Sequence, residues 1–119
     1  MTFIISHAGA VFPSLLDRMS AFSTAVLRSK LDSSPKTVKS ILQKQVMFDI
    51  AGMPFPEQIH GLLRCVDGSR LVYGSDFPFT PIEGVVMLAS VMEDGLDALF
   101  SEGQKDEIYA GNANRLLKL

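Results

Sequence analysis

Three short apolar runs, each followed by a loop and a stretch with helical spacing, constrain the fold of this chain most strongly. The runs are Phe3-Ile4-Ile5, Val46-Met47-Phe48-Asp49-Ile50 and Leu71-Val72-Tyr73. Apolar runs without alternation are typical of parallel strands covered on both faces. Three strand–helix units in succession predict parallel strands joined by right-handed crossovers. We therefore expect an α/β chain with at least three parallel strands.

Helical spacing fills the segments between the predicted strands. The first helix begins near Pro13 and is broken by Asp32-Ser33-Ser34-Pro35. Its apolar positions are Leu15, Leu16, Met19, Phe22, Val26 and Leu27. A second helical piece carries Val38, Ile41 and Leu42. A third helix begins near Pro56, where proline is tolerated, and ends at Asp67-Gly68. Its apolar face is Ile59, Leu62, Leu63 and Val66.

The fourth and fifth helices carry start signals. Thr80 is the predicted N-cap of the fourth, with Pro81 at the first helical position and Glu83 closing a capping box. Its predicted buried stripe is Ile82, Val85, Val86 and Ala89. Ser101 and Gln104 form a second predicted capping box, opening a helix through Ile108. A last short turn covers Asn114-Arg115-Leu116-Leu117.

Two polar residues stand where predicted strands end. His7 follows the first run beside Ala8-Gly9-Ala10, and Asp76 follows the third run before Phe77-Pro78-Phe79. Barrel enzymes keep their chemistry at the carboxyl ends of parallel strands. His7 is either a general acid/base or metal ligand, or a histidine bonded to a loop carbonyl. Asp76 is either a metal ligand or proton acceptor, or the anchor of an Asx turn.

Other polar and aromatic residues have less specific positions. Asp49 and His60 are expected to be structural, and Arg18 is either a solvated side chain or an anion-binding one. Phe77 and Phe79 either line the mouth of a pocket or pin the loop.

Composition excludes several classes of protein. The net charge of −2 provides no basic surface for nucleic acid. No apolar run approaches the ~18 residues that a membrane helix requires, and the N-terminus lacks the basic segment of a signal peptide. Cys65 is the only cysteine, which excludes an internal disulfide, fits a reducing compartment and favours a buried thiol. We expect a cytoplasmic location. P-loop, dinucleotide-binding, zinc-ribbon and esterase motifs are absent.

Four motifs in one order resemble a known family. They are Ile5-Ser6-His7-Ala8-Gly9-Ala10-Val11-Phe12-Pro13, Phe48-Asp49-Ile50-Ala51-Gly52, Leu71-Val72-Tyr73-Gly74-Ser75-Asp76-Phe77-Pro78-Phe79-Thr80-Pro81 and Gly111-Asn112-Ala113-Asn114-Arg115-Leu116. The chain resembles the C-terminal part of amidohydrolase-related (amidohydrolase 2) proteins of the aminocarboxymuconate-semialdehyde decarboxylase group. Within it, the 6-methylsalicylate and related aromatic-acid decarboxylases are most similar. The likeness covers residues 1–119 as part of one domain.

The resemblance implies a fold and a chemistry. The fold would be about strands six to eight, with their helices, of a metal-dependent (β/α)₈ barrel. The activity would be removal of CO₂ from small aromatic or related carboxylic acids, a carboxy-lyase reaction. Asp76 would bind the divalent metal, with zinc the expected ion, and His7 would be the acid/base residue. Arg18 matches an arginine that reaches the substrate of a neighbouring subunit, and Phe77 and Phe79 would line the substrate site.

The departures from the family pattern concern the metal ligands. The family has a His-x-His pair on its first strand and a further ligand histidine on its fifth, and His7 and His60 are the only histidines of this chain. We therefore expect the chain to be inactive alone, with a small carboxylic acid as substrate and either copies of itself or an N-terminal half-barrel as partner. The alternatives are a metal-dependent hydrolase of the same superfamily and a non-catalytic half-barrel that serves as an interaction module.

An isolated partial barrel would expose surface that a complete barrel buries. Both outer strand edges would lack partners, and the chain would self-associate. The side chains expected to be exposed are Phe3, Ile5, Val46, Phe48, Leu71 and Tyr73.

Overall fold

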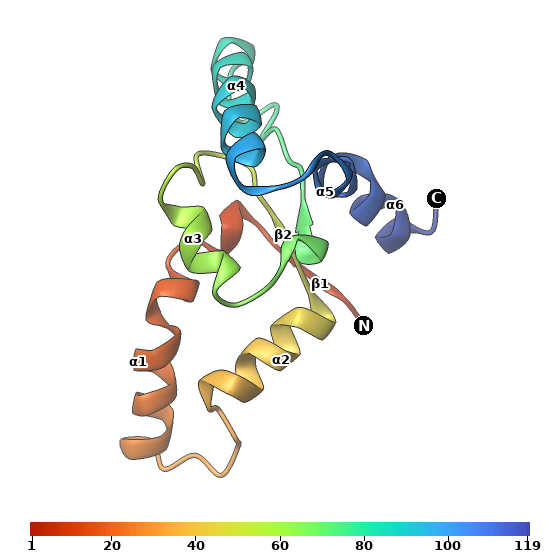
Figure 1. The fold of residues 1–119 in the computed structure, drawn as a ribbon. Coiled ribbons are helices and arrows are strands. Elements are labelled where there is room, and N and C mark those ends of the chain that lie inside the picture. The colour runs from red at the N-terminus through yellow and green to blue at the C-terminus, as the bar shows by residue number, and fades with distance from the viewer.

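The computed structural model describes all of residues 1–119 and contains one three-stranded parallel sheet with helices packed against it (Figure 1). The strands are β1 (Phe3–Ile5), β2 (Val46–Asp49) and β3 (Leu71–Val72), in the spatial order β1-β2-β3. Ile5 of β1 stands opposite Phe48 of β2, which stands opposite Leu71 of β3. The predicted α/β organisation with parallel strands is confirmed.

Nine helical segments connect and follow the strands. The α-helices are α1 (Phe12–Ala25), α2 (Pro35–Gln45), α3 (Gln58–Leu63), α4 (Ile82–Leu99), α5 (Glu102–Asp106) and α6 (Asn112–Leu117). The others are the 3₁₀ turns η1 (His7–Gly9) and η2 (Gly68–Arg70) and the π-helical turn η3 (Glu107–Gly111). The first helix ends at Ala25, earlier than its apolar pattern suggests.

Of the two capping boxes predicted at helix N-termini, one is correct and one is wrong. The Ser101–Gln104 capping box is present at the start of α5. Thr80 does not cap α4, which begins at Ile82 after Pro81 and has no side-chain cap. The Thr80 hydroxyl instead donates to Oδ2 of Asp76 at 2.8 Å. The carboxylate four residues earlier in the chain holds the hydroxyl that a capping box would use.

The core lies between the sheet and its helices. It is a cluster of 15 buried residues that includes Phe48 and Leu71 of the sheet with Ile59, Leu62 and Leu96 of the helices. The prediction that Val46, Phe48 and Leu71 would be exposed is wrong, because these side chains face the helices and are at most 6% exposed. Phe3 and Ile5 are exposed as predicted. Tyr73 is half-buried and its ring packs at a tilt against that of Tyr109, with ring centroids 5.3 Å apart.

The two outer edges of the sheet differ. The backbone N–H of Tyr73, just after β3, donates to the carbonyl of Ile108 at 3.0 Å. The side-chain amide of Asn112 donates to the carbonyl of Leu71 at 2.7 Å. The C-terminal helical segments therefore cover the outer edge of β3, and the prediction of two unpaired edges is wrong on this side. The outer edge of β1 has no partner strand.

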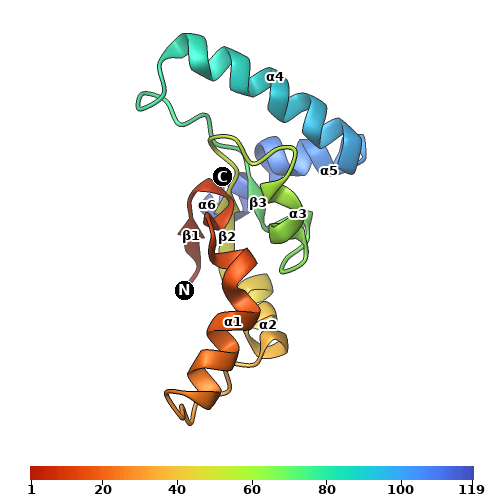
Figure 2. The same cartoon turned by 90° about the vertical axis from the view of Figure 1, so that its left-hand side faces the viewer.

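The molecule is elongated, with helices that extend away from the sheet. Its Cα radius of gyration is 15.5 Å, against roughly 13.5 Å for a compact domain of this length. The N-terminal half of α4 extends beyond the rest of the molecule (Figure 2). The predicted buried stripe of α4 is wrong in part. Ile82 and Val86 are exposed, Val85 and Ala89 are half-buried, and Met92 and Leu96 are the buried residues of this helix. In the first half of α4, Val85 and Ala89 line a small hollow with Gly52 and Tyr73, whereas Ile82 and Val86 are left uncovered.

Candidate active site

The carboxyl ends of the parallel strands carry His7, Asp49 and Asp76. His7 opens the turn η1 just after β1, Asp49 is the last residue of β2, and Asp76 lies in the loop between β3 and α4. Because parallel strands end at the same edge of a sheet, these residues share one end of the fold. The structure thus places both sequence-predicted residues, His7 and Asp76, at this end.

His7 has a left-handed backbone, with φ of 53°, as does Ala8 after it. Its N–H points to Oδ1 of Asp49 at 3.4 Å, and Nδ1 of its ring lies 3.5 Å from the carbonyl oxygen of Ala51. The side chain is exposed, and Nε2 has no hydrogen-bond partner within the chain. The structure therefore contains the loop-carbonyl contact of the structural alternative and leaves the second ring nitrogen available for chemistry.

Asp49, which was expected to be structural, joins two strand ends. Its Oδ1 accepts the N–H of Ala51 at 2.7 Å in addition to that of His7. Gly74 packs against the same carboxylate, and a Cβ at this position would lie 3.2 Å from Oδ1. The short-range signal for this role was an acid at the end of an apolar run. The contact with His7 crosses 42 positions of the chain and was not visible in the sequence.

Asp76 also has a left-handed backbone, with φ of 61°. Its Oδ2 accepts the hydroxyl of Thr80, and its carbonyl accepts the N–H of Thr80 at 2.9 Å. These two bonds anchor the loop, as the structural alternative predicted. Oδ1 makes no hydrogen bond, so one carboxylate oxygen is available to a ligand.

The three predicted substrate-binding residues are solvent-exposed. Phe77 is 62% exposed and Phe79 is 88% exposed. Arg18 lies on α1 and lines a hollow of about 310 Å³ together with Leu15, Met19 and Phe22. No hydrogen bond or ion pair joins Arg18 to His7 or Asp76.

The donor groups of the chain do not form a complete metal site. No group of three or more His, Cys, Asp or Glu side chains converges in the structure. Catalytic zinc sites use three protein ligands, and among the predicted site residues only the Asp76 carboxylate is assigned as a ligand. The structure therefore brings together fewer donor side chains than a catalytic zinc site uses.

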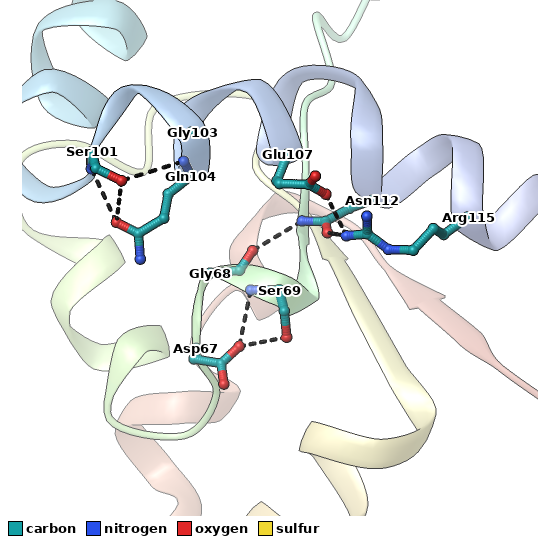
Figure 3. A pocket seen from close by; sticks show the side chains of 9 residues that line it. All are labelled: Asp67, Gly68, Ser69, Ser101, Gly103, Gln104, Glu107, Asn112 and Arg115. Carbon is teal, nitrogen blue, oxygen red and sulfur yellow. Dashed lines mark hydrogen bonds and ion pairs between the residues drawn. The ribbon is translucent and has the colours of Figure 1, made fainter.

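A polar cavity lies at the opposite end of the sheet (Figure 3). Its volume is about 470 Å³. The lining residues are Asp67, Gly68, Ser69, Ser101, Gly103, Gln104, Glu107, Asn112 and Arg115. Asp67 and Ser69 precede β3, so the cavity is remote from His7 and Asp76. Hydrogen bonds from Ser69 and Gln43 lower the pKa of Asp67. The side-chain amide of Asn112 donates to the carbonyl of Gly68 in η2 and to that of Leu71 in β3, which ties the cavity wall to the sheet.

The remaining titratable candidates are structural or exposed. Cys65 is buried, and loss of solvation raises the pKa of its thiol. His60 is exposed on α3 and makes no hydrogen bond through its side chain. None of the helices is both long enough and apolar enough to cross a lipid bilayer.

Comparisons with known proteins identify structural relatives. No protein-family model and no curated protein matches the chain. A solved structure named amidohydrolase II is 31% identical, with a TM-score of 0.79, and the match covers 100% of this chain and 36% of that one. An IDCase from Metarhizium anisopliae is 23% identical, with a TM-score of 0.76, and the match covers 99% of this chain and 34% of that one.

A third relative was solved with ligands. It is a dihydroxybenzoic acid decarboxylase from a Polaromonas species, with bound manganese and the inhibitor 2-nitroresorcinol. It is 20% identical, with a TM-score of 0.73, and the match covers 99% of this chain and 34% of that one. This chain thus spans about a third of the length of its structural relatives. It has the fold of about one third of an amidohydrolase-2 protein, and its resemblance to the amidohydrolase-related family is confirmed.

Proposed function

We propose that this chain supplies one part of the active site of a metal-dependent decarboxylase that acts on small aromatic carboxylic acids. The single observation that carries the proposal is the placement of His7 and Asp76 at the carboxyl ends of parallel strands, each with a free polar atom. Relatives with this fold include decarboxylases of 2,6-dihydroxybenzoate and 5-carboxyvanillate. Their substrates support an aromatic acid as the substrate class.

In this proposal residues 1–119 correspond to about strands six to eight of a (β/α)₈ barrel. Asp76 contributes one metal ligand through its free oxygen, and the other ligands come from outside the chain. His7 moves the proton through its unpaired ring nitrogen, as a general acid/base. Phe77 and Phe79 line the substrate site once the rest of the barrel covers them, and Arg18 binds the carboxylate of a substrate held by a neighbouring subunit.

A chimera tests the function. Residues 1–119 replace the matched 36% of the amidohydrolase II relative, which supplies the remaining strands. We expect the folded chimera to release CO₂ from a dihydroxybenzoate when a divalent metal is added. His7→Ala lowers kcat by about 10²–10⁴-fold, the usual contribution of a general acid/base. Asp67→Asn, at the opposite end of the sheet, is the control and leaves the rate unchanged. CO₂ release that persists in both His7→Ala and Asp76→Ala would contradict the proposal.

Two other functions make different predictions in the same experiment. The first is a metal-dependent hydrolase, which is supported by two relatives named as amidohydrolases. It would cleave ester or amide substrates without CO₂ release. The second is a non-catalytic interaction module, which is supported by the exposed apolar residues of β1, α1 and α4. It would show neither activity, and substitution of His7 or Asp76 would not weaken its binding to a partner.

A further inference from the structure

We propose that Asp49 is a positioning residue for His7, and that it selects which nitrogen of the imidazole carries the proton. The carboxylate holds the turn of His7 and the backbone of Ala51, and the carbonyl of Ala51 accepts a hydrogen bond from Nδ1–H. Nε2 is then the unprotonated nitrogen of the neutral ring. The catalytic role of this tautomer rests on the proposed acid/base function of His7. The contacts that select the tautomer do not depend on that function.

The turn that carries His7 needs support from outside. His7, Ala8 and Ala10 all have positive φ values, of 53°, 53° and 49°. This backbone region is unfavourable for residues with a Cβ, and such residues persist only where surrounding contacts determine them. Two side chains from later elements provide these contacts. Oδ1 of Asp49 accepts the N–H of His7, and Nε2 of Gln58 donates to the carbonyls of His7 and Ala10 at 2.9 and 3.1 Å.

In the proposed arrangement, the ring contact selects the tautomer. Nδ1 of His7 lies 3.5 Å from the carbonyl oxygen of Ala51. A carbonyl oxygen only accepts hydrogen bonds, so Nδ1 must carry the hydrogen if the two atoms are bonded. In a neutral imidazole the other nitrogen is then unprotonated. Gly52 leaves room for this orientation, because a Cβ there would lie 3.3 Å from Nδ1.

One carboxylate oxygen links the two halves of the arrangement. Oδ1 of Asp49 accepts the N–H of Ala51 at 2.7 Å, which fixes the peptide whose carbonyl meets the ring. The same oxygen faces the N–H of His7 at 3.4 Å, which fixes the backbone that bears the ring. Gly74 closes over the carboxylate from the β3 side, since a Cβ there would lie 3.2 Å from Oδ1 and 3.1 Å from Cβ of Ala51. Loss of Asp49 should therefore release the ring from Ala51.

The consequence concerns proton transfer. In water the neutral histidine side chain favours the tautomer with hydrogen on Nε2. The opposite tautomer makes Nε2 an acceptor without any change in the charge of the ring. An unprotonated Nε2 on an exposed side chain can accept a proton, or a hydrogen bond from an acidic group of a substrate.

Nitrogen-15 NMR of the full chain tests the inference. The protonated and unprotonated ring nitrogens differ widely in chemical shift, and His60 is the only other histidine. Spectra are recorded at a pH about two units above the ordinary histidine pKa of ~6.5, where the ring is neutral. His60→Asn assigns the two rings, and magic-angle-spinning spectra show the same nitrogens if the chain self-associates. We expect the hydrogen on Nδ1 in His7 and mainly on Nε2 in the exposed His60.

Variants separate positioning from simple structural support. In Asp49→Ala we expect the His7 spectrum to change to the His60 pattern, while Asp49→Asn, which keeps an acceptor oxygen, retains the Nδ1 hydrogen. Gly74→Ala displaces the carboxylate and is expected to shift His7 partly toward the His60 pattern. Gly103→Ala, which meets nothing within 4 Å, leaves the spectrum unchanged. Circular dichroism establishes that each variant is folded.

Two results would overturn the inference. The first is a wild-type His7 with the His60 pattern. The second is a folded Asp49→Ala that keeps hydrogen on Nδ1; if Asp49→Ala does not fold, an unchanged His7 spectrum in Gly74→Ala is decisive in its place. The spectra report on the imidazole alone, so a chimera without decarboxylase activity leaves the inference standing. Conversely, an NMR result that overturns the inference does not contradict the proposed role of Asp76 as a metal ligand.

Discussion

At the residue scale, the predicted site residues combine an exposed or half-buried polar side chain with a backbone that glycine would adopt more easily. His7 and Asp76 have φ values of 53° and 61°. Local strain of this kind clusters at functional sites, where the position of a side chain matters more than its cost. Nothing in the sequence near Asp76 required a left-handed backbone there. The strain became visible only with the structure, although the acid itself was predicted from its place after an apolar run.

Asp76 offers a test of this strain. Asp76→Gly removes the Cβ that disfavours positive φ, whereas Asp76→Ala keeps it, and both lose the bond from Thr80. We expect Asp76→Gly to unfold with a free energy about 1 kcal/mol higher than Asp76→Ala. Asp106, with a helical φ of −56°, is the matched control. There the order reverses, and alanine is more stable than glycine by up to ~1 kcal/mol. Urea titrations that place alanine above glycine at both positions would show that the backbone at Asp76 is not strained.

At the element scale, predictions held where both partners were close in the chain. Ser101 and Gln104 formed the predicted capping box because both of its bonds lie within one helical turn. Thr80 failed as a cap because Asp76 competed for its hydroxyl. Asn112 covers the outer edge of β3 through a bond that spans 41 positions. No local pattern identifies such a contact, although Asn112 lies in a motif that the resemblance had marked.

Glycine in the middle of α4 illustrates packing that overrides helix propensity. A Cβ at Gly95 would lie 2.3 Å from the ring of Phe55, so this side of the helix can meet Phe55 only without a side chain. We expect Gly95→Ala to destabilise the chain by about 1–3 kcal/mol, as overpacked substitutions do. Gly103→Ala in α5 meets open space and should stabilise by roughly 0.5–1 kcal/mol. Thermal unfolding of the two variants measures both effects, and a Gly95→Ala variant as stable as wild type would contradict the packing of α4 against Phe55.

At the scale of the whole molecule, the chain leaves apolar surface uncovered on several elements. Phe3 and Ile4 of β1 are 54% and 56% exposed, and Val86 of α4 is 66% exposed. The parallel sheet could be predicted from the order of apolar runs. The helix faces that remain uncovered could not be predicted. Helical periodicity identifies an apolar face, but it does not show whether the structure that covers this face belongs to the same chain.

The open edge of β1 should lead to self-association. An exposed apolar strand with unpaired backbone groups is a template for pairing with another chain. We expect light scattering to show concentration-dependent association of the wild-type chain. Ile4→Lys, which places a charge on the edge strand, should reduce association. Leu31→Lys, in an exposed loop, serves as the control and should not. A wild-type chain that stays monomeric across the concentration range would show that this edge does not attract partners.

Metal retention tests most directly whether the chain holds one part, and only one part, of a metal site. The isolated chain and the chimera with the amidohydrolase II relative are loaded with Mn²⁺ or Zn²⁺, dialysed and analysed for metal. We expect well under one ion per isolated chain, because no three ligating side chains converge in it. We expect one ion per chimera, and loss of that ion in Asp76→Ala. One ion retained by the isolated chain, or a chimera whose ion survives Asp76→Ala, would contradict the assignment of Asp76 to an incomplete site.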